Sequence, residues 1–275
     1  MENPVVKASV ILSKFDQPRA LSYALIGYQR QSTTDFEIVI ADDGSDTETR
    51  AVVHEFEKHG TIRIKHVWQE NKGYRRSKIA NEAVKISSGS TIILSDGDCI
   101  PHQDFVRHHL SRGGPNTFCV GGYVRLNDEQ TMALTPELVR NGAFEPHATV
   151  KDFSRFRWMH WKNMLYIAFR HPRKPKVYGC NISVHRDLYY AVNGYNENFD
   201  GFGKEDSDLR NRLVAFGARP VSLWGRATVF HLTDKLDPKI TQRRIPRKKN
   251  REYYDRPNVP SRCVNGLVKE GVPSL

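Results

Sequence analysis

Residues 91–98 read TIILSDGD, an apolar stretch that runs directly into two aspartates separated by one glycine. A short stretch of this kind, rich in β-branched residues, is typical of a strand buried within a sheet. Asp96 and Asp98 then fall at the end of that strand, where the glycine lets both carboxylates turn toward one cation. Oxygen ligands favour Mg²⁺ or Mn²⁺. Taken alone, the pair also fits a solvated turn.

Apolar stretches and amphipathic stretches alternate through the first hundred residues. This alternation predicts an α/β fold built on a mostly parallel, doubly wound sheet. In such sheets the ligand lies beyond the carboxyl ends of the strands, which is where the acidic pair falls. We expect strands at 5–12, 36–41, 62–68 and 91–94, and helices at 19–31, 47–59 and 77–87.

A second acidic pair, Asp42 and Asp43, closes the expected strand at 36–41 and is followed by Gly44 and Ser45. Adjacent residues on an extended chain point to opposite sides, so this pair is poorly suited to hold one metal ion. One of the two could instead accept a hydrogen bond from a nucleotide base or a ribose hydroxyl. An Asp-Gly sequence is also common in ordinary turns, so the pair alone decides nothing.

The stretch 199–208, FDGFGKEDSD, combines glycines and aromatic residues with a cluster of acids. Helix capping would explain Ser207 and Asp208, because the helix dipole stabilises ionised acids in a first turn. Capping does not explain the glycines and aromatic residues beside them. A carboxylate in such a loop could act as a general base toward a hydroxyl group. His231, after a late apolar strand, could complete a metal site, although a single histidine is more often structural.

The second half of the chain is less regular than the first. One helix, at 155–169, is rich in aromatic residues, and we expect it to pack into the core with a polar rim. The other helices are expected at 105–110, 186–192 and 205–216, and strands at 118–126, 176–184, 219–223 and 227–230.

The composition limits the classes of protein to which the chain can belong. Its 275 residues contain no apolar run of about 18 residues that could span a membrane. The first residues, MENPVVKASV, lack the basic and apolar regions of a signal peptide, so we expect a cytoplasmic protein. Four cysteines without a CxxC motif argue against a zinc site or a disulfide framework and fit a reducing compartment: Cys99, Cys119, Cys180 and Cys263.

The formal net charge of +11 is unevenly distributed along the chain. Residues 1–234 carry a net charge of +4, whereas residues 235–256 carry +6. We therefore expect a basic tail, 235–275, that is either solvated or docked on an anionic membrane surface at the inner face of the cell membrane. A nucleic-acid-binding protein would also be basic, but it predicts interleaved basic and aromatic residues on one face, which the body of the chain lacks. We expect no nucleic-acid partner.

Four motifs, in order, resemble those of the family-two glycosyltransferases of the GT-A fold. They are SVIL, FEIVIADDGSDTE, WQENKGYRRSKIANEA and ILSDGDCIP. The stretch 178–208, followed by VFHL, is similar to the galactosyltransferase-type module shared by animal β-1,4-galactosyltransferases and bacterial chondroitin-type polymerases. The resemblance implies a nucleotide-sugar-binding half at 1–125 and an acceptor-binding, catalytic half of the same domain at 126–234.

The resemblance also implies which residues contact the donor. Relatives commonly carry Arg just before Asn81, where this chain has Ala80. We therefore expect Lys78 to contact the diphosphate in its place. The uracil and ribose of a UDP-sugar would lie against Ser13, Phe15, Asp42, Asp43 and Asp96.

The remaining roles implied by the resemblance concern catalysis and the acceptor. Asp206 would deprotonate the acceptor hydroxyl, and Glu205 would contact a sugar. Phe202 and Asn181 would contact the acceptor, Phe202 standing where relatives usually carry Trp. The cofactor would be Mn²⁺ or Mg²⁺, held by Asp96, Asp98 and His231.

The function implied is inverting, metal-dependent transfer of a hexose or N-acetylhexosamine from a UDP-sugar to a hydroxyl of a glycan or glycolipid. The product would be a β-linkage, in the synthesis of bacterial cell-surface polysaccharide or lipopolysaccharide. A sugar nucleotidyltransferase is the enzymatic alternative. That class usually has a glycine-rich loop followed by Arg after the first strand, whereas this chain has SKFDQPR.

Overall fold

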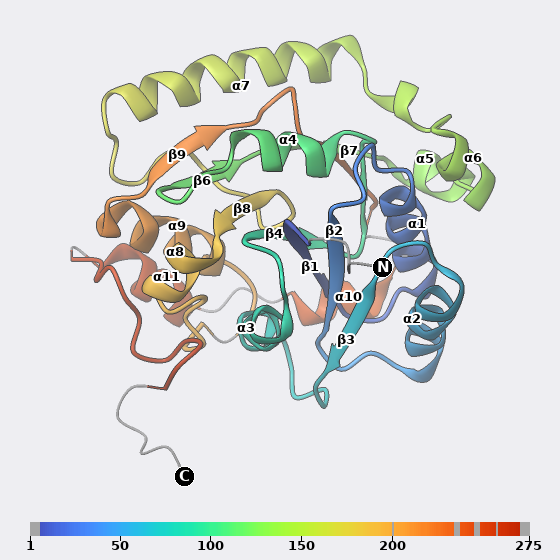
Figure 1. The fold of residues 1–275 in the computed structure, drawn as a ribbon, viewed down its shortest axis with the longest axis horizontal. Helices are drawn as coiled ribbons and strands as arrows, with labels where there is room; N and C mark the ends of the chain where they lie inside the picture. Colours follow the sequence, from blue (N-terminus) through green and yellow to red (C-terminus); the bar gives the residue numbers. More distant parts are fainter. Residues whose placement is uncertain (1–5, 200, 234–236, 245–247, 257, 270–275) are drawn as a thin grey trace.

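A seven-stranded mixed sheet forms the centre of the computed structural model, which describes residues 6–199, 201–233, 237–244, 248–256 and 258–269 (Figure 1). Its strand order is β3-β2-β1-β4-β8-β6-β9. Strand β8 is antiparallel to both neighbours and the other pairs are parallel, so the predicted α/β fold with a mostly parallel sheet is confirmed. The strands are β1 (Ala8–Lys14), β2 (Phe36–Asp42), β3 (Ile64–Trp68), β4 (Thr91–Asp96), β6 (Thr117–Val120), β8 (Ile182–His185) and β9 (Arg219–Ser222).

The register of the parallel strands brings their polar ends to one edge of the sheet. Ser13 of β1 pairs with Asp96 of β4, and Lys14 pairs with Asp42 of β2. These strands are buried along nearly their whole length and are mostly apolar up to these residues, because helices cover both sides of the sheet. The two acidic pairs found in the sequence therefore lie at neighbouring strand ends.

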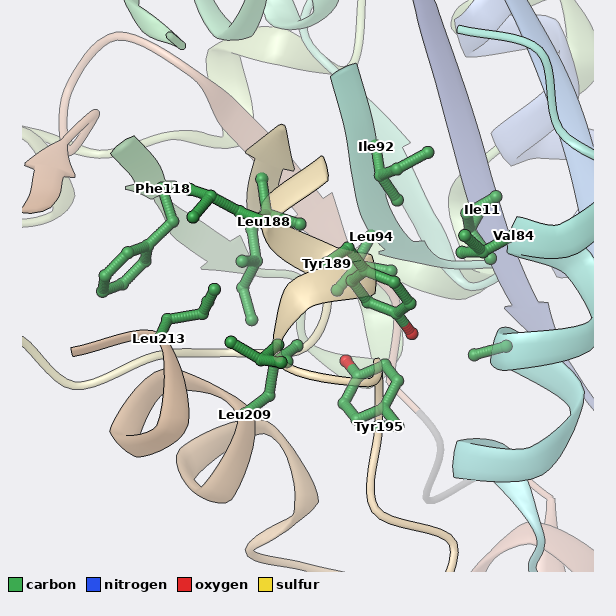
Figure 2. Close-up of a cluster of buried hydrophobic side chains, with 14 of the residues drawn as sticks. Ile11, Val84, Ile92, Leu94, Phe118, Leu188, Tyr189, Tyr195, Leu209 and Leu213 are labelled. Atoms are coloured by element: carbon green, nitrogen blue, oxygen red, sulfur yellow. The ribbon is translucent and has the colours of Figure 1, made fainter. Parts of the chain in front are cut away.

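Helices cover the two faces of the sheet in two groups. On one face, α3 (Arg76–Ile86), α8 (Arg186–Ala191) and α9 (Glu205–Phe216) pack against alternate residues of the strands. Figure 2 shows this core, with Leu188 of α8 and Leu209 of α9 directed toward the sheet. On the other face lie α1 (Pro18–Gln29), α2 (Thr47–His59) and α4 (Phe105–Arg112).

A smaller, three-stranded sheet has the order β5-β10-β7. Its strands are β5 (Cys99–Pro101), β7 (Gly122–Arg125) and β10 (Thr228–His231). The single strand expected at 118–126 is therefore two strands in different sheets. The chain passes from one sheet to the other at Gly121, where a Cβ atom would lie 2.2 Å from the side chain of Asn181. In the smaller sheet, His231 pairs with Cys99, which sets the histidine beside the acidic pair of β4.

Asn181 joins the two sheets. Its side-chain amide donates to the carbonyl oxygens of Gly122 and Ala227, at 2.8 and 2.9 Å. Its side-chain oxygen therefore accepts from Nε2 of His109 at 3.0 Å, and burial lowers the pKa of that imidazole to about 3. Asn181 is fully buried, so the expectation that it binds the acceptor is wrong. Of the strand expected at 176–184, only 182–184 forms, as part of β8, which begins directly after Asn181.

Helix α7 (Val150–Ala168) lies along the outside of the molecule, at the top of Figure 1, and packs against β9. We expected its aromatic residues to pack into the core. That expectation is wrong for most of them, because only Phe156 and Asn163 of the helix are buried. Apolar residues occur on every side of this helix, so the periodicity of the sequence does not distinguish an inner face. Ahead of it lie α5 (Asp128–Ala133), α6 (Pro136–Asn141) and a 3₁₀ turn at Glu145–His147.

The basic tail is folded in the part that the structure describes. It forms two short helices, α10 (Pro238–Arg243) and α11 (Lys248–Asp255). Asn250 is buried and donates to the carbonyl oxygens of Gly201 and Gly203, which fastens α11 to the loop before α9. The expected basic residues Lys235 and Arg247 lie outside the described residues.

Two other expectations from composition concern cysteines and membrane spans. The four cysteines are buried and free, so no disulfide links them. In the ranges that the structure describes, no helix is both long and apolar enough to cross a membrane.

We predict that Asn181→Ala destabilises the fold, because it leaves two buried carbonyl oxygens and the His109 ring without their partner. The free energy of unfolding should fall by about 3 kcal/mol, measured by urea denaturation followed by circular dichroism. The control is Asn116→Ala at an exposed loop position, which should change stability by less than about 0.5 kcal/mol. Equal stability of the two variants would show that Asn181 does not hold the sheets together.

Candidate active site

A cavity of about 880 Å³ opens at the edge where β1, β2 and β4 end. Its wall is completed by α3, the start of α9, strands β7 and β10, and the two helices of the tail. The cavity thus collects side chains from both halves of the chain. Of the residues expected from the sequence, those that line it are Ser13, Phe15, Asp43, Asp96, Asp98, Phe202, Glu205, Asp206 and His231.

Asp96, Asp98 and His231 bring their ligand atoms together, within 4.8 Å of one another and of the Cys99 sulfur. Nδ1–H of His231 donates to the carbonyl oxygen of Leu232 at 2.6 Å, which leaves Nε2 facing Asp98 at 3.9 Å. Burial raises the pKa of the Cys99 thiol well above its usual range, and a soft sulfur ligand is a poor match for a hard cation. Two carboxylates and an imidazole fit a hard divalent cation.

The electrostatic surroundings keep Asp98 ionised. Burial by itself would raise the pKa of this carboxyl group, but His231 and then Arg244 outweigh that effect and lower the pKa to about 2. A carboxylate must be deprotonated to bind a metal ion. Asp98 therefore has the charge of a metal ligand at any physiological pH.

Arg76, at the start of α3, connects the acidic residues of the cavity. Its guanidinium group donates to Asp96 at 3.1 Å and to Asp206 at 2.8 Å. It also donates to the carbonyl oxygen of Gly179 at 3.1 Å. A side chain at Gly179 would displace these groups, since a Cβ atom there would lie 2.5 Å from Asp206 and 2.7 Å from Arg76.

The basic residue of α3 that lines the cavity is Arg76, and the expectation that Lys78 contacts the diphosphate is wrong. Lys78 is exposed and does not line the cavity, because residues two apart on a helix point to nearly opposite sides. The sequence did contain the relevant signal. Arg76 stands three and four residues before Ile79 and Ala80, which belong to the buried face of α3.

Glu205 and Asp206 are neighbours in sequence but have different surroundings. Oδ1 of Asp206 accepts from Arg76 and, at 2.7 Å, from the hydroxyl of Tyr195. Among the described residues, no hydrogen bond is made to its other oxygen, Oδ2. Glu205 is buried and its Oε1 accepts from Tyr74 at 3.4 Å. Burial, and then the charge of Asp206, raise the pKa of Glu205 to about 7.

The pair at the end of β2 also separates into an inner and an outer residue. Asp43 lines the cavity and is held by the backbone N–H of Arg75 at 2.7 Å and the side chain of Gln69 at 2.5 Å. Asp42 is fully buried and accepts from the backbone N–H of Ser45 at 2.8 Å. The expectation that Asp42 faces a nucleotide is therefore wrong, because neighbouring residues at a strand end point apart.

The tail contributes two arginines that sequence reasoning did not place in the site. The guanidinium carbon of Arg243 lies 3.6 Å from the centre of the Phe15 ring, and its Nη2 is 2.9 Å from Asp43. Nη2 of Arg244 lies 3.5 Å from Asp98. A cavity lined with carboxylates attracts a basic segment, so charge complementarity was the available signal.

A mostly parallel sheet with an acidic, metal-compatible cavity at its carboxyl edge fits the GT-A fold that the motifs predict. A family model described as Glycosyl transferase family 2 matches residues 9–189, which is more than half of the chain. The chain belongs to glycosyltransferase family 2. A second model, described as the N-terminal domain of galactosyltransferase, matches residues 165–233. The resemblance to family-two glycosyltransferases is confirmed. The family match favours this assignment over the nucleotidyltransferase and nucleic-acid-binding alternatives.

Characterised relatives agree with this assignment. Over 224 residues the chain is 29% identical to validoxylamine A glucosyltransferase of Streptomyces hygroscopicus subsp. jinggangensis, covering 76% of this chain and 51% of that protein. It is 26% identical over 237 residues to chondroitin synthase of Pasteurella multocida, covering 78% and 24%. The chain thus spans about half, or less, of the length of these relatives.

Solved structures show the same fold at low sequence identity. The mannosyltransferase PcManGT from Pyrobaculum calidifontis, in complex with GDP-Man and Mn²⁺, has a TM-score of 0.59 and 15% identity, covering 92% of this chain and 64% of that one. TarS 1–349 of S. aureus, in complex with UDP-GlcNAc, has a TM-score of 0.56 and 17% identity, covering 83% and 59%. GalNAc-T7 with UDP, GalNAc and Mn²⁺ has a TM-score of 0.58 and 13% identity, covering 92% and 50%.

We predict that Asp98→Asn and His231→Gln each lower the affinity for Mn²⁺ at least about tenfold, because each removes one ligand from a small set. Free Mn²⁺ can be measured by electron paramagnetic resonance, without any substrate. Glu129→Gln, at an exposed position on α5, is the control and should bind as the wild type does. Unchanged Mn²⁺ affinity in both site variants would exclude this cluster as the metal site.

Proposed function

We propose that this glycosyltransferase is an inverting, metal-dependent enzyme that moves a hexose or N-acetylhexosamine from a UDP-sugar to a hydroxyl of a glycan or glycolipid, forming a β-linkage. The observation that carries the proposal is one cavity that is lined by Asp98, His231 and Asp206, with Asp206 linked to Asp96 through Arg76. UDP, UDP-GlcNAc and Mn²⁺ are bound by structural relatives, which supports this choice of donor and cofactor.

Asp96, Asp98 and His231 would hold Mn²⁺ or Mg²⁺. The ion would supply Lewis-acid stabilisation of the departing diphosphate. Lys14 and Arg244, which line the same part of the cavity, would add positive charge there. Burial lowers the pKa of Lys14 to about 8, so this amine remains mostly protonated at neutral pH.

The nucleotide would lie against Asp43, Ser13 and Phe15. Asp43 is already oriented by Gln69 and by the backbone of Arg75, so its carboxylate is prepared to accept hydrogen bonds from a base or ribose. Arg243, which stacks on Phe15, would either move aside or become part of the pocket for the nucleobase.

Asp206 would act as the general base. Its Oδ1 is fixed by Arg76 and Tyr195, while Oδ2 remains available to the acceptor hydroxyl. The hydroxyl oxygen would attack the anomeric carbon on the face opposite the diphosphate, its proton would pass to Oδ2, and the configuration would invert. Glu205 is more buried than Asp206, so an acceptor hydroxyl would reach it less easily, and we assign Glu205 to sugar binding.

The acceptor would lie against Phe202, which packs edge-on to Tyr74 with ring centres 5.8 Å apart. An aromatic face suits the apolar side of a sugar ring. We propose a cytoplasmic role in bacterial cell-surface polysaccharide or lipopolysaccharide synthesis, as the resemblance implies. Contact of the tail with an anionic membrane remains part of this proposal, but Arg243 and Arg244 are engaged in the cavity.

We predict that Asp206→Asn lowers turnover by about 10²–10⁴-fold, because an amide cannot accept the proton. Turnover is measured as hydrolysis of whichever UDP-sugar the wild type consumes fastest in a screen with Mn²⁺. Calorimetry should show that the UDP affinity of Asp206→Asn is within about twofold of that of the wild type. Glu205→Gln is the comparison and should retain more activity. The assignment of Asp206 as the base is wrong if Asp206→Asn keeps its activity and Glu205→Gln loses it. If the wild type hydrolyses none of the UDP-sugars, the proposed donor is wrong.

We predict that Arg244→Ala weakens UDP binding in the presence of Mn²⁺ about tenfold, because a charge-assisted contact to the diphosphate is lost. Lys239→Ala removes a charge from α10, the helix that directly precedes Arg244, at a position outside the cavity, and it should leave the affinity unchanged. Both are measured by calorimetry. Equal affinities in the two variants would mean that Arg244 does not contact the donor.

A further inference from the structure

The outward side of α7 carries large apolar residues that no described part of the chain covers. Trp161 is 71% exposed and Phe169, directly after the helix, is 81% exposed. These side chains recur at helical spacing along the whole length of α7, so they form one continuous surface. We call this surface the outer face of α7; it consists of Val150, Phe153, Trp158, Trp161, Met164, Leu165 and Phe169.

The opposite side of the same helix is what attaches it to the domain. Phe156 is buried against Trp224, with ring centres 5.7 Å apart, and Asn163 is buried beside Ser222 of β9. The 19 residues of α7 extend for about 28 Å along the edge of the molecule. Figure 1 shows no other element above it. The outer face is therefore a long, accessible apolar strip on a firmly packed helix.

Basic residues accompany this strip. Residues 150–170 contain five basic side chains and one acidic one, Asp152, which is occupied in the cap formed with Thr149. Nζ of Lys162 lies 4.4 Å from the centre of the Trp158 ring, so the ammonium group stays next to the apolar surface. The five basic residues are Lys151, Arg155, Arg157, Lys162 and Arg170. Arg155 is turned toward the domain, where it donates to the carbonyl oxygen of Tyr123 at 2.6 Å and lies 3.3 Å from Asp152, which leaves the other four for the surface.

We propose that the outer face of α7 inserts into the interfacial region of an anionic lipid bilayer and holds the enzyme on the membrane surface. Tryptophan and phenylalanine on one side with lysine and arginine along the borders is the pattern of helices that lie in the plane of a membrane. The apolar side chains enter the boundary between headgroups and acyl chains, while the basic groups bind anionic headgroups. This surface is separate from the tail and from the cavity.

A second copy of the chain suits this surface less well. Two outer faces packed on each other would bring their basic borders together, and like charges in a desolvated interface repel. A lipid surface of negative charge meets both the apolar and the basic residues. If the proposed function holds, membrane binding would also bring a glycolipid acceptor to the surface on which the enzyme sits.

Vesicle flotation of the full chain tests the proposal without any sugar donor, so its outcome does not depend on the proposed function. The vesicles contain phosphatidylglycerol and phosphatidylcholine in equal parts, or phosphatidylcholine alone. We expect binding to the anionic vesicles that Trp158→Gln/Trp161→Gln weakens at least about tenfold. Tryptophan emission of the wild type should shift to shorter wavelength on binding, and the variant should lose that shift.

Three controls separate α7 from other surfaces. Ile86→Gln/Val264→Gln replaces two exposed apolar residues on α3 and in the last described segment, and it should float as the wild type does. Lys151→Gln/Arg157→Gln should weaken binding to the anionic vesicles and increase its sensitivity to salt. Lys239→Gln/Lys249→Gln tests the tail. Thermal unfolding confirms that each variant is folded.

The proposal is overturned if the wild type does not float, or if Trp158→Gln/Trp161→Gln floats equally well. It is also overturned if only the tail variant loses binding, since the tail would then be the membrane contact. Light scattering measures whether the protein is a dimer. If the wild type is a dimer and Trp158→Gln/Trp161→Gln is a monomer, the outer face of α7 is a dimer interface and the lipid proposal is wrong.

Discussion

The candidate site depends on one buried cation, the guanidinium group of Arg76. Asp96, Asp206 and Glu205 all lie within 4 Å of it, at 3.1, 2.8 and 3.9 Å. Carboxyl groups so close together repel one another, and burial raises the pKa of both Asp96 and Glu205. A shared arginine offsets this repulsion and fixes the geometry, because its planar group donates in several directions at once. It thereby joins the metal-binding side of the cavity to the side that holds the proposed base.

The two sheets must be held in register for that connection to form. Asp96 belongs to the end of β4, whereas His231 arrives from β10 of the smaller sheet. Asn181 links the two sheets through hydrogen bonds to the buried carbonyl oxygens of Gly122 and Ala227, and a third bond to His109 of α4 holds its side chain. The tail then closes the wall of the same cavity with Arg243 and Arg244. Segments far apart in the chain are thus drawn together by charge and by buried polar contacts.

Much of the fold could be predicted because the signals are local. The boundaries of α2 at 47–59 and α9 at 205–216 follow from apolar spacing and from the turn residues at their ends, and both are observed as expected. Strand ends carrying Asp43, Asp96 and Asp98 could be placed at one edge because parallel strands share a direction. Helix α7 could be located but not oriented, since aromatic residues surround it and its inner face is chosen by contact with β9.

The sequence by itself determined the alternation of strands and helices in the first hundred residues, the family, and the acidic residues at the ends of the strands, because each depends on neighbours a few residues away. Only the tertiary structure decided which member of a pair faces the cavity. Arg76 rather than Lys78, and Asp43 rather than Asp42, are turned inward by packing. The tertiary structure also decided that Asn181 is buried and that the basic tail folds back to the site. Both depend on contacts between segments far apart in the sequence, which no local pattern records.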